Sequence, residues 1–259
     1  MLVGSLDLTH LTNQSLGRVP GRTSRGTEPA ARPTLILCHS PLVGPATWSE
    51  VGSVLRERGW PVVIPSLLAA RDGPPPLWRH FVQSAAAAAT GPPAEVVLVG
   101  HSGAGPLLPQ IGALLRPRNR GYVFVDAGLP HPTEPTPIAP PEFLAQLRAL
   151  ATGDRLPPWS QWWGEDAMRS LLPDDALRAR VTAELPSLPL AYFEEAVPAA
   201  TWWPDAPCGY LWFSEPYASA ASEAQARGWP VAHLPGHHLH LLTNPGAVAD
   251  ALVQLLERG

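Results

Sequence analysis

Near the middle of the chain stands Val99-Gly100-His101-Ser102-Gly103-Ala104-Gly105, where a short apolar run meets a cluster of small residues. Residues 95–99 (EVVLV) predict a buried strand, and residues 103–115 predict a helix. A sharp turn from strand to helix strains the residue at the bend and exposes its side chain at the sheet edge. We therefore expect the Ser102 hydroxyl to project from this bend, while Gly100 and Gly103 let strand and helix pass closely.

Short apolar runs alternate with helical patterns on both sides of this bend. The other expected strands are residues 34–38, 61–65, 121–126, 209–213 and 230–234. The other expected helices are residues 48–58, 77–90, 218–227 and 245–257, and residues 1–33 predict an irregular arm with a short strand at 3–8. This alternation is typical of the α/β class, in which a mostly parallel central sheet carries helices on both faces.

Residues 129–207 interrupt the alternation. They are rich in Pro, with helical patches at 142–151 and 174–184 and no obvious strand. Five of the ten Trp residues lie here: Trp159, Trp162, Trp163, Trp202 and Trp203. We expect a core of residues 1–128 and 208–259, with residues 129–207 as an insertion over one end of the sheet.

Composition excludes several classes of function. The net charge of −4 gives no attraction to nucleic acid or to an anionic membrane, and no apolar run approaches the ~18 residues of a bilayer crossing. All 18 basic residues are Arg, so chemistry that needs a Lys amine is excluded. The N-terminal residues show no basic segment followed by an apolar one, the pattern of a secretory signal. Two Cys residues are too few for a disulfide framework. We expect a soluble, cytoplasmic protein, and the sequence leaves its oligomeric state open.

The Ser102 motif and its setting resemble the α/β-hydrolase fold superfamily, with its serine esterases and lipases of bacterial type. The resemblance covers about residues 34–258. It implies that Ser102 is the nucleophile, that the Gly103 N–H faces an oxyanion, that residues 129–207 form a lid, and that no cofactor is needed. The family pattern G-x-S-x-G is broken by Ala104, but Gly105 follows, so we expect the Ala methyl to be accommodated.

A second pattern, Leu234-Pro235-Gly236-His237-His238-Leu239-His240, lies between the last strand and the last helix. The resemblance places the catalytic His there, seven positions before the Pro that opens the last helix. That Pro is Pro245, which selects His238. The rival interpretation is a metal site formed by His233, His237, His238 and His240, but it needs a further carboxylate and a converging geometry, and we expect no metal.

Two carboxylates compete as the partner of His238. Glu215 follows the strand 209–213, but its loop is short for the family's usual reach. Asp126 ends the strand 121–126, at the sheet edge where a carboxylate reaches the site. For either residue the alternative is a helix cap or a solvated loop charge. We leave both open, with a slight preference for Asp126.

The loop Cys38-His39-Ser40-Pro41-Leu42 departs from the family pattern. In relatives the sequence at this loop is His-Gly-x, and the N–H of x is the second oxyanion donor. Relatives commonly have a Trp nine positions after this His, and Trp48 stands nine positions after His39, which supports the alignment. Here x is Pro41, which has no N–H. The Leu42 N–H or the Ser40 hydroxyl could substitute, and we expect His39 to support the loop from beneath.

These observations favour a serine hydrolase that cleaves an ester, thioester or related acyl bond in a small, largely apolar or aromatic molecule. Four Trp residues of the insertion are candidates for its binding: Trp159, Trp162, Trp163 and Trp202. The alternative is a non-hydrolytic enzyme on the same fold, performing cyclisation, lactone formation, elimination or C–C cleavage in specialised metabolism. Its one clue is the N–H missing at Pro41. A catalytically silent binding protein is the third hypothesis, and the presence of both Ser102 and His238 argues against it.

Overall fold

The expected strands assemble into one parallel sheet. The structure is a computed structural model that describes residues 31–89 and 94–258. Six strands hydrogen-bond in the order β2-β1-β3-β4-β7-β8, and every pair is parallel. They are β1 (Thr34–Cys38), β2 (Val62–Val63), β3 (Val96–His101), β4 (Asn119–Val125), β7 (Cys208–Trp212) and β8 (Val231–His233). The predicted fold class is thereby confirmed.

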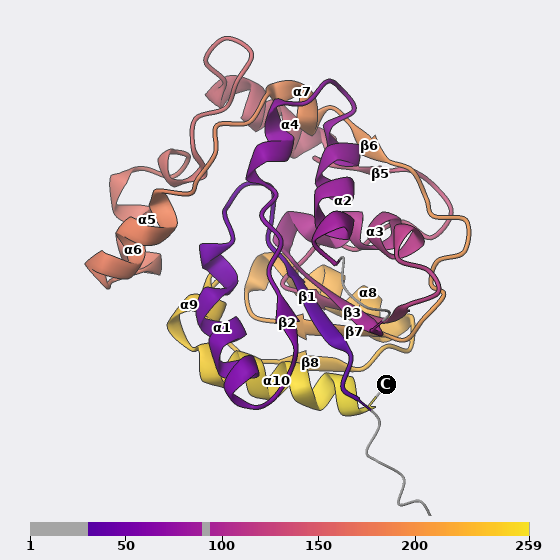
Figure 1. Ribbon diagram of the computed structural model, residues 1–259. Coiled ribbons are helices and arrows are strands. Elements are labelled where there is room, and N and C mark those ends of the chain that lie inside the picture. The colour runs from indigo at the N-terminus through magenta and orange to yellow at the C-terminus, as the bar shows by residue number, and fades with distance from the viewer. Residues whose placement is uncertain (1–30, 90–93, 259) are drawn as a thin grey trace, which may run out of the picture. The chain divides into compact units, whose positions relative to one another are not determined.

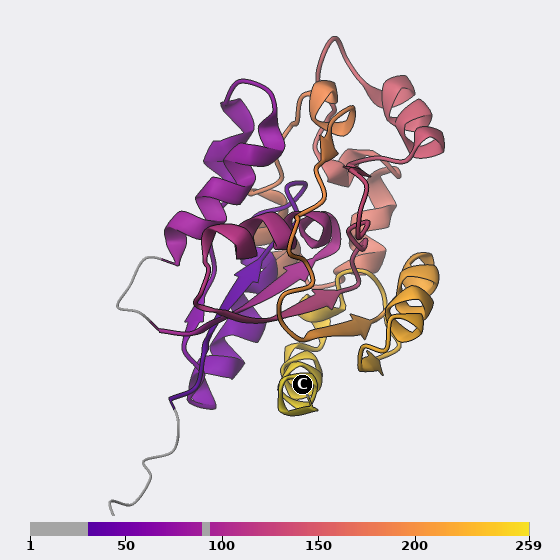
Figure 2. The same ribbon diagram turned by 90° about the vertical axis from the view of Figure 1, so that its right-hand side faces the viewer.

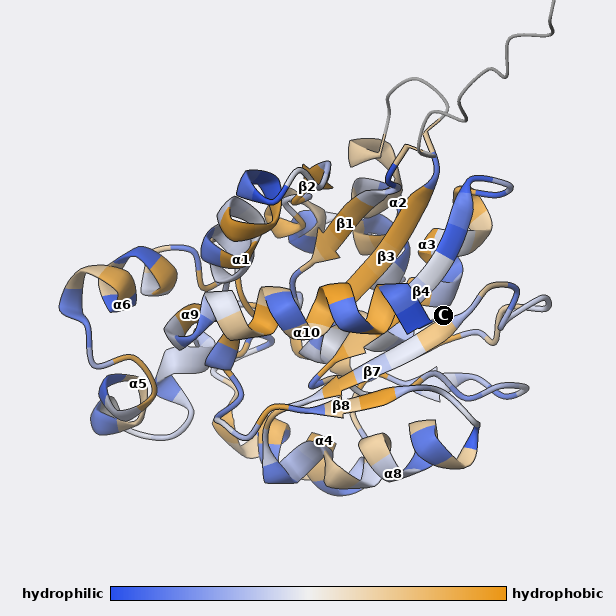
Figure 3. Cartoon of the chain, turned by 90° about the horizontal axis from the view of Figure 1, so that it is seen from below, coloured by the Kyte–Doolittle hydropathy of each residue, from blue (hydrophilic) through white to orange (hydrophobic). Residues whose placement is uncertain are grey.

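Helices cover both faces of the sheet (Figure 1, Figure 2). One face packs against α1 (Ala46–Glu57), α9 (His240–Thr243) and α10 (Pro245–Arg258), and the other against α2 (Leu77–Ala88), α3 (Leu108–Leu114) and α8 (Ala218–Ala226). Because side chains alternate along a strand, Leu35 and Leu37 join the core on the α1 side, whereas Ile36 and Leu98 join the core on the α2 side. Figure 3 shows β1 and β3 hydrophobic over most of their length, while α10 alternates between apolar and polar positions.

Most expected boundaries lie within two residues of those in the structure. The largest difference follows Ser102, where the expected helix 103–115 is divided into a 3-10 helix, η2 (Ser102–Leu107), and α3. Pro106 and Pro109 cannot donate backbone hydrogen bonds, which disfavours one continuous α-helix. Expected strand 61–65 is reduced to β2, and η1 (Leu68–Asp72) was not expected. The strand expected at 3–8 lies outside the described residues.

The chain between β4 and β7 consists of short helices and one small pair of two-residue strands that are far apart in the sequence. Its elements are β5 (Thr136–Pro137), α4 (Pro141–Leu150), η3 (Trp159–Gln161), α5 (Glu165–Leu171), α6 (Asp175–Thr182), α7 (Leu190–Phe193) and β6 (Ala196–Val197). β5 and β6 pair antiparallel, so the expectation of no strand here is wrong. In Figure 1, α5 and α6 extend sideways beyond α1, and α4 and α7 lie beyond α2.

Two carboxylates of this segment bind the N-termini of core helices. Glu184 accepts the Ala46 N–H at 2.7 Å, and Glu195 accepts the N–H groups of Leu77 and Trp78 at 2.6 and 3.0 Å. Negative charge at these positions stabilises a helix because it satisfies free amides and complements the helix dipole. The segment is therefore tied to the core, and both belong to one compact unit that begins at Arg32. Its action as a lid stays a prediction.

Among the described helices, none combines the length and the apolar character that a bilayer crossing requires.

Candidate active site

Ser102 stands at the bend between β3 and η2, with its backbone in the left-handed region (φ 57°). A non-glycine residue there is strained, as expected for this bend. A Cβ at Gly100 would lie 2.9 Å from the Leu108 side chain, so Gly100 does allow close packing of strand and helix. A Cβ at Gly105 would lie 2.2 Å from the Gly128 carbonyl oxygen, whereas the Ala104 methyl is accommodated and buried. The position at which no side chain fits is therefore Gly105, one residue later than the last Gly of the family pattern G-x-S-x-G.

His238 lies in the loop after β8 and contacts both Ser102 and Asp126. Its Nε2 is 2.9 Å from Ser102 Oγ, and its Nδ1 is 2.8 Å from Asp126 Oδ2. Because an ionised carboxylate only accepts, the Nδ1 hydrogen is donated to Asp126. Nε2 is then free to accept the Ser102 hydroxyl proton. The three side chains form a continuous hydrogen-bonded series at the carboxyl edge of the sheet.

Asp126 follows β4, is fully buried, and also has a left-handed backbone (φ 43°). Its Oδ1 accepts the N–H groups of Phe213 and Ser214, both at 2.9 Å, and its Oδ2 accepts the Ser214 hydroxyl at 2.5 Å. Burial alone would raise the pKa of Asp126, but the hydrogen bonds from His238 and Ser214 outweigh it and hold the pKa below its ordinary value. The carboxylate is therefore ionised and fixed in position.

The other carboxylate candidate, Glu215, takes no part in this series. It opens the 3-10 helix η4 (Glu215–Tyr217) and is exposed to solvent. Its neighbour Ser214 binds Asp126 instead. The structure brings Asp126, and not Glu215, against His238.

His101 supports His238 from behind. Its Nε2 lies 2.9 Å from the His238 carbonyl oxygen, and the two rings stack with centroids 4.6 Å apart. Burial, with the neighbouring His238 ring, lowers the pKa of His101 to about 3. A neutral ring that donates from Nε2 fixes the backbone of the loop that carries His238.

The region beside Ser102 contains all three candidate oxyanion donors. The Leu42 N–H lies 3.3 Å from Ser40 Oγ, and a Cβ at Gly103 would lie 3.0 Å from the same Oγ. The Ser40 hydroxyl thus sits between Gly103 and Leu42. His39 beneath the loop accepts the Leu67 N–H through Nε2 at 3.1 Å and donates through Nδ1 to the Ser40 carbonyl at 2.8 Å. The expected supporting position of His39 is confirmed.

The Trp residues proposed to bind substrate lie in different surroundings. Trp162 is buried, donates to the Pro157 carbonyl at 2.8 Å and packs on Phe143 and Phe193. Trp159 is partly buried between the two cores. Trp163 and Trp202 are 56% and 70% exposed. Their role in substrate binding stays a prediction.

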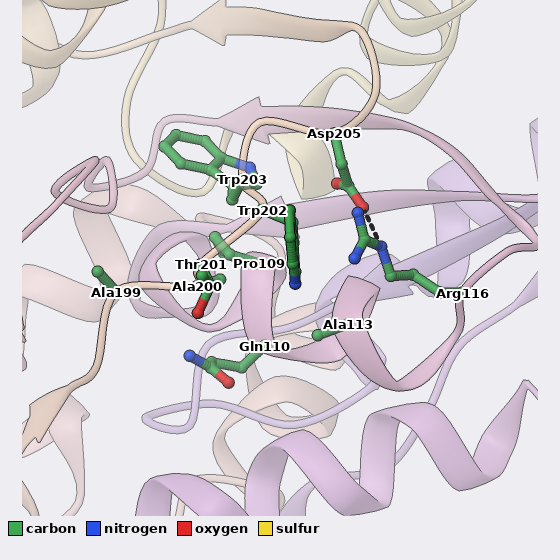
Figure 4. Close-up of a pocket in the computed structure, with 10 residues that line it drawn as sticks. All are labelled: Pro109, Gln110, Ala113, Arg116, Ala199, Ala200, Thr201, Trp202, Trp203 and Asp205. Atoms are coloured by element: carbon green, nitrogen blue, oxygen red, sulfur yellow. Dashed lines mark hydrogen bonds and ion pairs between the residues drawn. The ribbon is translucent and has the colours of Figure 1, made fainter.

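Trp202 lines a cavity of about 190 Å³ together with Trp203, Arg116 and Asp205. In Figure 4 the Trp202 ring stands near the middle of the view, and Arg116 is bound to Asp205 to its right. A second cavity of about 580 Å³ lies between α6 and the start of α10. Neither cavity is lined by Ser102, Asp126 or His238.

The metal interpretation finds no support in the geometry. Across residues 31–89 and 94–258, no three His, Cys, Asp or Glu side chains converge as metal ligands. His233 instead stacks on Trp212 with centroids 3.8 Å apart. His237 and His240 lie near the surface, 5.9 Å apart between ring centroids.

Sequence reasoning missed Tyr217, whose hydroxyl lies 3.3 Å from Ser102 Oγ. It also missed Ser214, which binds Asp126. Both residues follow β7 at the carboxyl edge of the sheet, where the loops of neighbouring parallel strands meet. That position was the available signal, because polar side chains after such a strand lie near the site.

Comparison with known proteins identifies the architecture. Among solved structures, an extracellular α/β-hydrolase from a Paenibacillus species, described as homologous to Tobacco Salicylic Acid Binding Protein 2, aligns with TM-score 0.68, 19% identity and coverage of 86% of this chain and 98% of its own. Polyneuridine aldehyde esterase aligns with TM-score 0.65, 17% identity and coverage of 86% and 99%. The pyrethroid hydrolase PytH aligns with TM-score 0.64, 19% identity and coverage of 87% and 98%. At these identities the likeness shows the fold.

A comparison with curated proteins gives no match. The family model described as "Alpha/beta hydrolase family" matches residues 35–251, which include Ser102, Asp126 and His238. The chain therefore belongs to the alpha/beta hydrolase family.

Proposed function

We propose that this protein is a serine hydrolase that cleaves an ester, thioester or related acyl bond in a small, largely apolar molecule. One observation carries the proposal: Asp126, His238 and Ser102 are joined by hydrogen bonds of 2.8 and 2.9 Å. Such a series activates a hydroxyl as a nucleophile, because the imidazole accepts its proton while the carboxylate fixes the tautomer.

In the proposed reaction, Ser102 Oγ attacks the carbonyl carbon while its proton passes to His238 Nε2. Asp126 stabilises the imidazolium that forms. His238 then gives the proton to the leaving group, which departs with the electron pair of the broken bond. A water molecule then attacks the acyl carbon while His238 takes one of its protons. The bond from the acyl carbon to Ser102 Oγ breaks, His238 gives the proton to Oγ, and the acid product leaves.

The negative charge on the carbonyl oxygen needs hydrogen-bond donors. The Gly103 N–H is one, and the second comes from the Ser40 hydroxyl or the Leu42 N–H, which lie together beside Ser102. Whichever of these two groups donates replaces the N–H that Pro41 lacks. Loss of one donor from such a site typically costs about 10²–10³ in kcat.

The proposed substrate class is consistent with the relatives. The printed names of two structural neighbours describe a polyneuridine aldehyde esterase and a pyrethroid hydrolase. The segment between β4 and β7 contains Trp159 and other apolar side chains, and a substrate site lined by such side chains would suit a small apolar acyl compound.

The direct test is hydrolysis of p-nitrophenyl esters of graded acyl length by wild type and by Ser102→Ala. We expect turnover by the wild type and a loss of at least about 10⁴ in kcat for Ser102→Ala. The matched control is Ser222→Ala on α8, whose hydroxyl bonds the Ala218 carbonyl of its own helix. Wild-type turnover by Ser102→Ala would reject the serine mechanism.

The absence of an N–H at Pro41 favours a second candidate function. This is a non-hydrolytic reaction in which a nucleophile within the substrate, instead of water, attacks the acyl-enzyme. One structural neighbour is a tomato methylketone synthase, with TM-score 0.63 and 13% identity. Product analysis in H₂¹⁸O separates the two. Incorporation of the label supports hydrolysis, and its absence supports transfer or cyclisation.

A further inference from the structure

Tyr217 lies against two of the three triad residues. Its hydroxyl is 3.3 Å from Ser102 Oγ. Its ring is nearly parallel to the His238 imidazole, with an interplanar angle of 9° and centroids 4.9 Å apart. The phenol therefore borders the space beside both Ser102 Oγ and His238 Nε2, where a departing group receives its proton.

The loop that carries Tyr217 is held by several hydrogen bonds. The Tyr217 N–H donates to the Ser214 carbonyl at 3.0 Å, and the same carbonyl accepts Trp212 Nε1–H at 2.7 Å. Ser214 in turn binds Asp126 through its N–H and its hydroxyl. One short loop thus anchors the acid of the triad and presents the phenol to the nucleophile.

The direction of the Tyr217 hydrogen bond follows from the triad. His238 donates from Nδ1 to Asp126, so its Nε2 accepts the single proton of the Ser102 hydroxyl. Ser102 Oγ then has only lone pairs to offer Tyr217, which must be the donor. Burial raises the pKa of Tyr217 to about 12, although its hydrogen bond with Ser102 opposes the shift, so the phenol keeps its proton at neutral pH.

We propose that Tyr217 is a further catalytic residue, whose hydroxyl passes its hydrogen bond from Ser102 Oγ to the leaving-group oxygen as the acyl-enzyme forms. This inference rests on the proposed function. In this step Ser102 Oγ bonds to the acyl carbon, and the bond from that carbon to the leaving oxygen breaks with its electron pair on the oxygen. His238 gives that oxygen the proton taken from Ser102. Tyr217 keeps its own proton throughout.

The exchange has a physical driving force. Once Ser102 Oγ is part of an ester it is a weaker hydrogen-bond acceptor, whereas the departing oxygen carries growing negative charge and is a stronger one. The benefit is largest for basic leaving groups. The inference therefore narrows the proposed substrate to oxygen esters of poorly acidic alcohols, because sulfur is a weak acceptor.

The test compares Tyr217→Phe with wild type on aryl acetates whose phenols grow more basic, from p-nitrophenyl acetate to phenyl acetate. The variant keeps the aromatic ring against His238 and loses the hydroxyl. We expect kcat/KM to fall by no more than about 3-fold with p-nitrophenyl acetate and by roughly 10–100-fold with phenyl acetate. The matched control is Tyr192→Phe, a buried tyrosine that packs on Phe81 and Phe193. It should leave both rates unchanged.

An equal loss on every ester would overturn the inference, because a merely structural role does not depend on the leaving group. No loss on either ester would also overturn it. The same comparison applies to covalent labelling of Ser102 by aryl phosphonates with the same two leaving groups, which needs no turnover. Ser102→Ala separates the two proposals. If it stays active, the serine mechanism fails; if it is inactive while Tyr217→Phe behaves as wild type, only the role of Tyr217 fails.

Discussion

Asp126 and His238 are 112 positions apart in the sequence, yet Asp126 Oδ2 lies 2.8 Å from His238 Nδ1. Parallel strands explain this proximity, because β3, β4 and β8 all end at the same edge of the sheet. Ser102 and Asp126 come directly after β3 and β4, and His238 lies in the loop that follows β8. The sheet therefore determines the geometry of the site, and each side chain can be tested separately.

The Asp126–His238 bond predicts a large effect of Asp126→Asn. The amide can donate to Nδ1, which favours the wrong imidazole tautomer, so we expect kcat on p-nitrophenyl esters to fall by roughly 10³–10⁴. Glu215→Gln is the control, because this side chain is exposed, and it should stay within about 2-fold of wild type. The reverse pattern would make Glu215 the acid of the triad.

Ser214 is predicted to act through Asp126. Ser214→Ala removes the hydroxyl that donates to Oδ2 at 2.5 Å and should lower the free energy of unfolding by roughly 1.5–3 kcal/mol at neutral pH. We also expect kcat to fall by about 10-fold, because the carboxylate loses one restraint. Denaturant unfolding and steady-state kinetics measure the two effects. Wild-type values of both in Ser214→Ala would show that the two backbone N–H groups suffice to hold Asp126.

The oxyanion site is tested at Ser40. Removing its hydroxyl in Ser40→Ala takes away one candidate donor and the acceptor that orients the Leu42 N–H. We expect kcat to fall by about 10²–10³ with little change in KM. The control is Ser53→Ala, an exposed position on α1. Full kcat in Ser40→Ala would assign the second donor to the Leu42 N–H alone.

Two buried histidines predict acid-sensitive stability. Burial lowers the pKa of His39 to about 4 and that of His101 to about 3, from an ordinary value of 6.5. Between pH 6.5 and about 4 the unfolded chain binds protons at these residues and the folded protein does not. The free energy of unfolding therefore falls as the pH falls, by about 1.4 kcal/mol per pH unit for each residue.

Denaturant unfolding measured across this window checks the prediction, and His39→Gln should remove about half of the slope. Asp126 contributes separately. Its folded pKa is depressed below the ordinary 3.8, so its stabilisation is present above that value and is lost only as the pH falls further. A stability that does not change between pH 6.5 and 4 would contradict the neutral, buried state of both histidines.

The small residues after Ser102 predict a steric clash for one of two neighbouring substitutions and only a small loss of stability for the other. Gly105→Ala places a Cβ 2.2 Å from the Gly128 carbonyl oxygen, so we expect a loss of at least roughly 1–3 kcal/mol in the free energy of unfolding. Ala104→Gly restores the family motif, and should keep wild-type kcat at a cost of about 1 kcal/mol. Thermal unfolding compares the two. A tolerated Gly105→Ala would mean that the Gly128 backbone yields easily.

The fold could be predicted because its signals are local. Residues 34–38 form an apolar run between turn residues, and β1 occupies that range. The helix after Ser102 was predicted less well, because Pro106 and Pro109 change its type without changing its position. The pair β5 and β6 was missed since two-residue strands carry no periodic pattern.

The site was predictable where a motif fixes the spacing and ambiguous where it does not. Ser102 and His238 each stand in a recognisable pattern, whereas Asp126 and Glu215 both follow a strand at the same sheet edge. Only the arrangement in space distinguishes them. Composition likewise could not separate Trp162, which is buried in the core, from Trp202, which is exposed. Tyr217 had no motif and was found through its contact with Ser102.

The most direct measurement of the central claim is intact-protein and peptide mass spectrometry after treatment with a fluorophosphonate. The account predicts one covalent adduct, located on Ser102, that forms quickly in wild type, slows strongly in His238→Ala and is absent in Ser102→Ala. A wild-type protein that stays unlabelled, or an adduct that persists in Ser102→Ala, would contradict the account.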